Sequence, residues 1–197
     1  LLFYRLGDFY EMFFDDAITA SRELELTLTG RECGLPERAP MCGVPHHAVD
    51  TYVTRLIEKG YRVAICEQME DPSAAKGLVK RAITRIITPG TVTDQSALAE
   101  RKNNYLTSVC IEGKRAGIAY VDVTTGEFYA TQLSSAEREL KGALSSIAPR
   151  EIITHNAEFV AAVCDASQSH CPQSAFQGAR ATEALTKHFC VSALTAL

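Results

Sequence analysis

Several features that define common protein classes are missing from the sequence. No apolar run approaches the roughly 20 residues that a membrane-spanning helix needs. Arg5 and Asp8 interrupt the apolar opening segment, so that it does not resemble a signal peptide. No Cys-x-x-Cys pair, no GxxxxGK motif followed by Ser or Thr, and no GxSxG motif occurs. The sequence therefore contains no zinc-ribbon, P-loop or hydrolase signature, and we expect no membrane association.

Cysteine is present, but in a pattern that argues against disulfides. The seven cysteines are an odd number at irregular spacing, whereas disulfide frameworks use even numbers. Cys42 and Cys66 stand in apolar contexts, where a free thiol behaves as a small buried hydrophobe. Hydrophobic residues make up 46% of the chain and charged residues 22%, as in globular domains. We expect a reduced, cytoplasmic protein.

The net charge of -4 argues against simple nucleic-acid binding. The positive charge is local, because four basic residues fall within ten positions and no acidic residue occurs from 72 to 93. Such a segment can follow a phosphate backbone even in an acidic protein, although a solvated basic face has the same composition. The four residues are Lys76, Lys80, Arg81 and Arg85.

The length of 197 residues allows one large domain or two of about 100 residues. In the first half, apolar residues spaced as on one helical face predict a helix over 47–59, with Gly60 as its stop. Residues 26–45 are rich in Gly and Pro and are expected to form turns. The remaining elements predicted in this half are a β-hairpin over 1–14, a helix over 15–25, and strands over 61–68 and 82–88.

The polar segment 92–104 has no apolar period, and we expect the domain boundary there. Three strands should follow, over 105–111, 116–123 and 127–133. Ser135 is the expected N-cap of a helix over 136–147. Further predictions are a strand over 151–154, helices over 157–163 and 181–189, and a loop over 165–180.

The opening hairpin contains the most informative residue pair. Gly7-Asp8 is a strong turn signal, and it places Phe9 at the start of the returning strand. Alternate residues of a strand share a face, so Phe9 and Glu11 should point the same way. An exposed aromatic wedge beside a hydrogen-bond acceptor would suit recognition of a base inside a duplex. The alternative is that Phe9 and Phe13 belong to the core and that Glu11 is a solvated edge charge.

Six longer motifs follow one another along the chain: GDFYEMF at 7–13, PMCGVPHHAV at 40–49, VAICEQ at 63–68, RIITPGT at 85–91, NNYL at 103–106 and DVTTGEF at 122–128. In order and spacing they resemble motifs of the DNA mismatch repair MutS family. The resemblance is strong over residues 1–133 and weaker from 134 onward, and several motifs in the right order are more specific than any one of them.

The resemblance implies an α/β fold with two domains. A mixed sheet flanked by helices over 1–90, the mismatch-recognition domain, would precede a linker over 91–102. An RNase H-like connector domain, catalytically silent and truncated, would occupy 103–197. Phe9 would be the intercalating residue, Glu11 its hydrogen-bonding neighbour and Leu6 an apolar support. The expected DNA-backbone contacts are Arg31, Lys76, Lys80 and Arg81.

The resemblance also implies properties of a longer protein. The chain lacks an initiator Met and closes on an apolar run at 192–197, so we expect it to be a fragment. The parent would be a homodimeric, DNA-dependent ATPase that uses ATP and Mg²⁺ through a P-loop outside this segment. It would bind duplex DNA containing mispairs or small loops and recruit a MutL-type partner. This segment itself would hold no cofactor, metal or catalytic residue.

Three other functions compete with mismatch binding. A zinc site could use Cys33, Cys42, His46, His47 and Cys66, but their spacing is irregular. An RNase H-like nuclease could use paired carboxylates to hold two Mg²⁺ ions. A plain interaction module that does not bind DNA would be favoured by loss of Phe9 or Glu11, and both are present. The candidate carboxylates for a nuclease are Asp8, Glu11, Asp15, Asp16 and Asp122.

Overall fold

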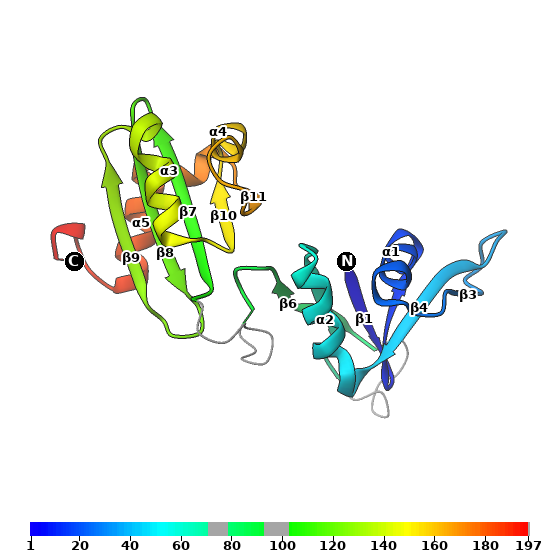
Figure 1. Cartoon of the computed structure of the whole chain (residues 1–197). Coiled ribbons are helices and arrows are strands. Elements are labelled where there is room, and N and C mark those ends of the chain that lie inside the picture. Colours follow the sequence, from blue (N-terminus) through cyan, green and yellow to red (C-terminus); the bar gives the residue numbers. More distant parts are fainter. Residues whose placement is uncertain (71–78, 93–102, 197) are drawn as a thin grey trace. The chain divides into compact units, whose positions relative to one another are not determined.

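The computed structural model describes residues 1–70, 79–92 and 103–196. The chain forms two compact units, Leu1–Ala97 and Leu98–Leu197, and each is built on one mixed β-sheet with helices (Figure 1). The predicted α/β class is therefore correct. The predicted linker over 91–102 lies outside the described residues except at its first two positions. No helix in the described part of the chain is both long and apolar enough to span a bilayer.

The first unit contains a six-stranded sheet in the order β3-β4-β2-β1-β5-β6. β1 and β5 pair in parallel, and all other neighbours are antiparallel. The predicted opening hairpin is confirmed, since β1 and β2 pair on either side of a two-residue turn. The strands are β1 (Leu2–Leu6), β2 (Phe9–Phe13), β3 (Thr29–Arg31), β4 (Ala39–Pro45), β5 (Val63–Gln68) and β6 (Arg81–Ile87).

The helices α1 (Phe14–Leu24) and α2 (Val49–Glu58) pack against one face of this sheet. A 3₁₀ turn, η1 (His46–Ala48), leads into α2. The helices bury their apolar stripes against alternate residues of the strands, which is the pairing expected when two amphipathic elements share a core. The buried residues are Ala17, Ala20 and Leu24 of α1; Val53, Leu56 and Ile57 of α2; and Phe3, Tyr10, Met12, Cys42, Val44, Val63 and Ile65 of the sheet.

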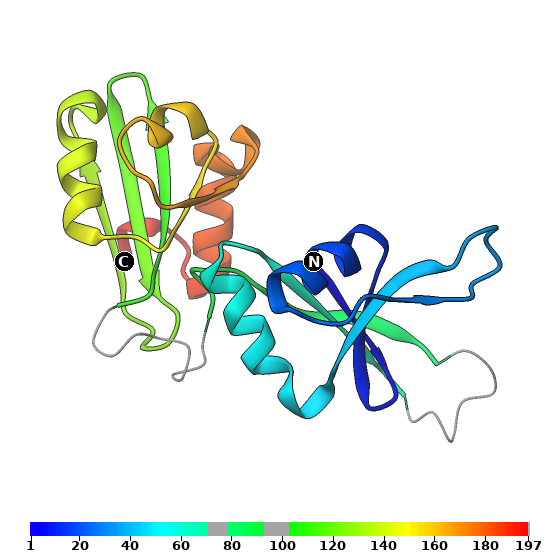
Figure 2. The ribbon, with the colours of Figure 1, turned by 45° about the vertical axis from the view of Figure 1, so that its right-hand side comes forward.

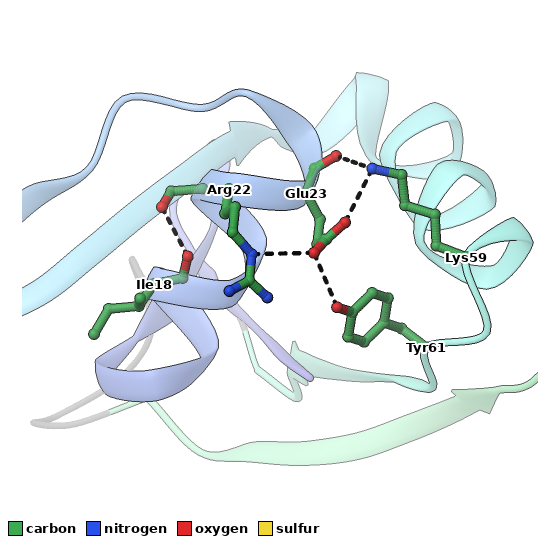
Figure 3. Close-up of polar contacts among 6 residues, drawn as sticks. Ile18, Arg22, Glu23, Lys59 and Tyr61 are labelled. Carbon is green, nitrogen blue, oxygen red and sulfur yellow. Dashed lines mark hydrogen bonds and ion pairs between the residues drawn. The ribbon is translucent and has the colours of Figure 1, made fainter.

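A polar cluster joins the ends of the two helices (Figure 3). Lys59 Nζ donates to the Glu23 carbonyl oxygen at 2.7 Å and to its carboxylate at 3.0 Å, and the Tyr61 hydroxyl donates to the same carboxylate at 3.0 Å. The Lys59 and Tyr61 hydrogen bonds hold the pKa of the Glu23 carboxyl below its usual value. Since Lys59 and Tyr61 follow α2 and Glu23 lies in α1, the cluster ties the helices together on one side of the sheet.

Residues 26–45 form more regular structure than the sequence predicts. Pro40, Gly43 and Pro45 indicate turns locally, yet the segment contains β3 and all of β4. β4 pairs with β2 on one edge and β3 on the other, and it turns Cys42 and Val44 into the core beneath α1. Pairing and burial therefore outweigh the local turn propensity.

The second unit contains a five-stranded sheet in the order β11-β10-β7-β8-β9. Three antiparallel strands are followed by two strands that pair in parallel, which is the predicted RNase H-like layout. Figure 2 shows α3 and α5 on opposite sides of this sheet. The elements are β7 (Tyr105–Glu112), β8 (Arg115–Asp122), β9 (Phe128–Leu133), α3 (Ala136–Ile147), β10 (Glu151–Thr154), α4 (Ala157–Ala161), β11 (Ser167–His170), η3 (Gln173–Phe176), α5 (Gly178–Phe189) and η4 (Leu194–Ala196).

The core of this unit lies between α3, α4 and the sheet, where Leu140, Leu144 and Val160 pack against strand residues such as Val109. Two local predictions differ from the structure. Ser135 precedes α3 but its hydroxyl does not cap the helix; instead the Glu139 carboxylate accepts from the Ser135 amide at 3.0 Å. The predicted loop over 165–180 contains β11, a polar strand that pairs with β10. Its sequence has no apolar pattern from which this pairing could be predicted.

Asp122 organises the turn between β8 and β9. Its side chain is buried, and one oxygen accepts from the Thr124 amide at 2.9 Å and the Thr124 hydroxyl at 2.6 Å. The other oxygen accepts from the Asn104 amide at 3.0 Å. The Thr124 hydroxyl makes the largest contribution to lowering the pKa of this carboxyl below its usual value. Asp122 therefore shapes a turn and anchors the start of β7.

Replacing Asp122 by Asn should destabilise the chain by about 1–3 kcal/mol at neutral pH, because hydrogen bonds to a charged group are lost. A carboxyl whose pKa is lowered by folding contributes fully above the ordinary aspartate value of about 4. That contribution is lost as the pH falls through the lowered pKa. Urea unfolding should therefore give a smaller difference between wild type and Asp122→Asn at pH 3 than at pH 7. Asp165→Asn, at an exposed aspartate of the same unit, is the control; an equal difference at both pH values would contradict the assignment.

Candidate nucleic-acid interface

The turn at Gly7 and Asp8 is held from two sides. Gly7 has φ +57°, a conformation that favours glycine. The Arg5 side chain donates from Nε to the Gly7 carbonyl oxygen at 2.5 Å. The His46 amide, at the start of η1 and directly after β4, donates to the Asp8 carbonyl oxygen at 2.9 Å. Both exposed carbonyls of the turn are thus engaged, which fixes the position of the residue that follows.

Tyr10 anchors the hairpin from beneath. Its ring is buried, its hydroxyl donates to the Glu67 carboxylate on β5, and the Arg5 guanidinium lies 5.3 Å from the ring centroid. Burial is the main cause that raises the pKa of the Tyr10 hydroxyl, and the bond to Glu67 adds to it. The phenol therefore stays protonated and acts as a donor that links β2 to β5.

The side chains of β2 alternate strictly between the two faces of the sheet. Tyr10 and Met12 are buried under the helices, whereas Phe9 is 48% exposed on the opposite face. Phe9 and Glu11 share that face, as predicted from the strand period. The alternative that Phe9 belongs to the core is wrong. Leu6, its cross-strand partner on β1, is partly buried beside it.

Glu11 forms an ion pair with Arg31, a residue that sequence analysis suggested only as a DNA-backbone contact. Arg31 Nη1 lies 2.6 Å from Glu11 Oε2. The Glu11 side chain is 18% exposed and that of Arg31 is 48% exposed. The Arg31 guanidinium carbon also lies 6.0 Å from the centroid of the Phe13 ring. Glu11 is therefore a paired carboxylate in the interior of the sheet rather than a solvated edge charge.

Gly43 makes room for the Glu11 side chain, a role that the sequence analysis did not identify. It lies opposite Glu11 on β4, the strand between Glu11 and Arg31. A Cβ atom at this position would lie 3.2 Å from the Tyr10 carbonyl oxygen and 3.4 Å from Glu11 Cγ. A glycine inside a strand often marks a close approach, but the Gly and Pro residues of 26–45 indicated turns, so the sequence contains no signal for this role.

The other basic residues that are predicted to contact the DNA backbone differ in their surroundings. Arg81 donates from Nε to the Arg5 carbonyl oxygen at 3.0 Å, and its guanidinium carbon lies 5.1 Å from the Tyr4 ring centroid. Tyr4 pairs with Glu11 across β1 and β2, so Arg81 lies on the same face as the Arg31–Glu11 pair. Lys80 is exposed at the start of β6. Lys76 lies outside the described residues.

The candidate metal-binding and catalytic residues do not come together. No group of three or more His, Cys, Asp or Glu side chains that could hold a metal occurs in residues 1–70, 79–92 and 103–196. Cys42 points into the core, where burial raises the pKa of its thiol to about 11. Among the acidic candidates for a nuclease, Glu11 is paired with Arg31, Asp16 accepts from the Leu2 amide at 2.8 Å, and Asp122 is occupied by its turn.

The fold and this surface define a class, a two-unit α/β protein whose first unit presents an aromatic side chain, a paired carboxylate and arginines on one sheet face. Comparison with known sequences gives the family. The model of MutS domain I matches residues 1–96, and that of MutS domain II matches residues 104–197. The chain belongs to the DNA mismatch repair MutS family.

Individual relatives agree with the family models. The DNA mismatch repair protein MutS of Ruminiclostridium cellulolyticum is 61% identical over 158 residues, which cover 79% of this chain and 18% of that protein. The protein of the same name from Clostridium botulinum strain 657 is 58% identical over 153 residues, covering 78% of this chain and 16% of the relative. The chain thus spans less than a fifth of the length of these relatives.

Replacing Gly43 by Ala should destabilise the first unit by about 1–2 kcal/mol, because the added methyl group crowds a backbone oxygen that cannot move freely. Gly117, in β8, is the matched control, since a Cβ there meets nothing within 4 Å. Gly117→Ala should be neutral or slightly stabilising. Urea unfolding of both variants measures the difference; equal stability of the two would show that Gly43 has free space.

Proposed function

We propose that this chain binds mismatched or small-loop duplex DNA by inserting Phe9 at the mispaired base and kinking the duplex. The observation that supports this most directly is the half-exposed Phe9 ring at the tip of a hairpin whose turn is clamped by Arg5 and His46. Glu11, two residues along the same face, would accept a hydrogen bond from the displaced base. No chemical step is assigned to this segment.

The energetics of a wedge explain how one site can accept many mispairs. Partial unstacking costs a few kcal/mol per base step, and stacking of a base on an aromatic ring returns roughly 1–3 kcal/mol. These terms nearly cancel, so the balance depends on the DNA. A mispaired or unpaired base has weaker pairing and a softer step, which lowers the deformation cost. Selectivity then follows from deformability and not from a base code.

The open face also offers basic groups for the phosphates. Arg81 lies across the face, with its guanidinium carbon 5.1 Å from the centroid of the Tyr4 ring. Lys80, which is exposed next to β6, would extend this region along the duplex backbone. Local positive charge of this kind can bind DNA although the net charge of the chain is -4.

The activity of a longer protein belongs to the same proposal. The relatives are named DNA mismatch repair protein MutS and are bacterial. We propose that the full-length protein that contains this chain is a cytoplasmic homodimer that uses ATP and Mg²⁺ at a site outside these 197 residues. Matched segments correspond to domains I and II of the family, so this chain would supply recognition and coupling and not ATP hydrolysis.

Phe9→Ala in the full-length protein should reduce the affinity for a G·T duplex by roughly 10- to 100-fold, because the stacking energy is lost. Affinity for the matched duplex should change little, since non-specific binding depends on phosphate contacts. Titrations of both duplexes at one fixed salt concentration measure the effect. Phe14→Ala is the matched control, because Phe14 is 52% exposed in the same unit but follows the other end of β2.

The same titrations of both duplexes would be made with the variants Glu11→Gln and Glu11→Ala. Each should change the ratio of mismatch to match affinity, because Glu11 is assigned a contact with the displaced base. Unchanged preference in Phe9→Ala would make Phe9 a bystander and leave the first unit as a scaffold. Equal discrimination by wild type and both Glu11 variants would remove Glu11 from the recognition surface.

The second unit suits a contact with a partner protein. β9 is an edge strand of its sheet, and it exposes Phe128 to 57% and the neighbouring Tyr129 to 45%. Exposed aromatic side chains are common anchors at protein interfaces. Together with the match to domain II, this surface supports our proposal that the unit contributes to binding a MutL-type partner.

Phe128→Asp in the full-length protein should weaken binding of a purified MutL-type protein about tenfold, the typical loss when an interface anchor is removed. Gln132→Asp adds the same charge on the same face of β9 and should have little effect. Binding would be measured by surface plasmon resonance in the presence of mismatched DNA and ATP. Equal affinities of the two variants would exclude this part of β9 from the interface.

A further inference from the structure

We infer that Arg31 is the positioning residue of the Glu11 carboxylate: it neutralises and orients this group so that one oxygen is free to accept a hydrogen bond from a displaced base. The inference rests on the proposed function, and it assigns Arg31 a role different from a contact with the DNA backbone. Three features of the described structure support it: the geometry of the Arg31–Glu11 pair, the space that Gly43 leaves beside Glu11, and the oxygen of Glu11 that Arg31 does not contact.

The geometry joins two strands that are not neighbours. Arg31 lies on β3 and Glu11 on β2, with β4 between them. The side chain of Arg31 crosses β4 and ends 2.6 Å from Glu11 Oε2, a short, charge-assisted contact. The Phe13 ring lies beside the guanidinium, with 6.0 Å between the guanidinium carbon and the ring centroid. The contact is therefore held from a second direction by a cation–π interaction.

β4 carries no side chain at the position opposite Glu11. Gly43 is the cross-strand partner of Glu11, and a Cβ atom there would lie 3.4 Å from Glu11 Cγ. A larger residue would displace the carboxylate from its present place. Gly43 and Arg31 thus restrict the same side chain, one by leaving space and the other by attraction.

Glu11 Oε1, the oxygen that Arg31 does not contact, is the atom that would bind DNA. Among the described residues, Glu11 Oε1 has no hydrogen-bond partner, whereas Oε2 is occupied by Arg31. An unpaired carboxylate facing a duplex would be repelled by the phosphates, and an opposite charge at this distance offsets that repulsion. Oε1 keeps its lone pairs and lies two residues from Phe9, about 7 Å along the strand. It is therefore placed to accept from the edge of a base that stacks on Phe9.

This role makes Arg31 a determinant of specificity. Its positive charge is balanced by Glu11, so its removal leaves an uncompensated acid on the DNA-facing surface. An arginine that contacts only a phosphate would act independently of Glu11. The two roles differ in one measurable respect: whether the effect of losing Arg31 depends on the charge at position 11.

The test is a double-mutant cycle in the full-length protein, with titrations on a G·T duplex and its matched twin. Arg31→Gln should reduce mismatch affinity about fivefold and lower the ratio of mismatch to match affinity, as expected for a partly exposed ion pair. In a Glu11→Gln background, the same Arg31 substitution should change affinity by less than about twofold, because no acid remains to be neutralised. Arg31→Lys, which keeps the charge, should retain most of the discrimination.

Arg38→Gln is the matched control. Arg38 lies on the loop that joins β3 and β4 and pairs with the exposed Glu32 at 3.3 Å, so its loss removes the same charge without touching Glu11. It should leave the ratio of affinities unchanged. Urea unfolding of each variant checks that the first unit remains folded.

The outcomes separate this inference from the proposed function. If wild type prefers the mismatch and Arg31→Gln weakens binding equally in both backgrounds, Arg31 is a phosphate contact and the positioning role is overturned. If Arg38→Gln lowers the ratio as much as Arg31→Gln, the effect comes from general charge and the role is also overturned. If wild type does not distinguish the two duplexes, the proposed function fails and the role of Arg31 fails with it.

Discussion

The hydrogen bond from the His46 amide to the Asp8 carbonyl oxygen, 2.9 Å long, joins the hairpin turn to the start of η1, directly after β4. A free two-residue turn would let the tip of the hairpin move, and Phe9 stands directly beyond it. Arg5 on β1 donates to the Gly7 carbonyl oxygen, and Tyr10, the residue after Phe9, donates to Glu67 on β5. The backbone that carries the exposed ring is therefore bonded to β1, to β5 and to the residue that follows β4. The wedge that we propose for Phe9 would have to resist the duplex that it deforms, and this attachment would provide the resistance.

The two faces of the first sheet differ in character: one is packed against the helices, and the other is the surface for which we propose DNA recognition. Apolar side chains of β2 and β4 are buried beneath α1 and α2. The opposite face carries an ion pair, an aromatic ring and a second arginine. The net charge of -4 therefore does not describe the charge on either face. The local arrangement of charges matters more than their sum: Arg31 neutralises Glu11 at 2.6 Å, and the Arg81 guanidinium lies over the Tyr4 ring.

Much of this architecture follows from the sequence, for identifiable reasons. The Gly7-Asp8 pair and the strand period predict the hairpin and the shared face of Phe9 and Glu11, and the helix over 136–147 is found at the predicted residues. β4 was not predicted because its prolines and glycine suggest turns, while its pairing partners are distant in sequence. The Arg31–Glu11 pair was not predicted either, since it depends on a side chain crossing an intervening strand. Local propensity does not contain such tertiary information.

The alternation along β2 has an evolutionary implication. Tyr10 and Met12 serve the core and Phe9 and Glu11 serve the surface, in a strand where successive side chains face opposite ways. A shift of pairing by one residue would turn all four side chains over, placing the phenylalanine and the acid inside and the core residues outside. The two surface residues and the two core residues therefore depend on one pairing register. Because a shift by one residue would expose Tyr10 and Met12, the packing of the core fixes Phe9 and Glu11 on the open face, and sequence changes at the surface must keep that register.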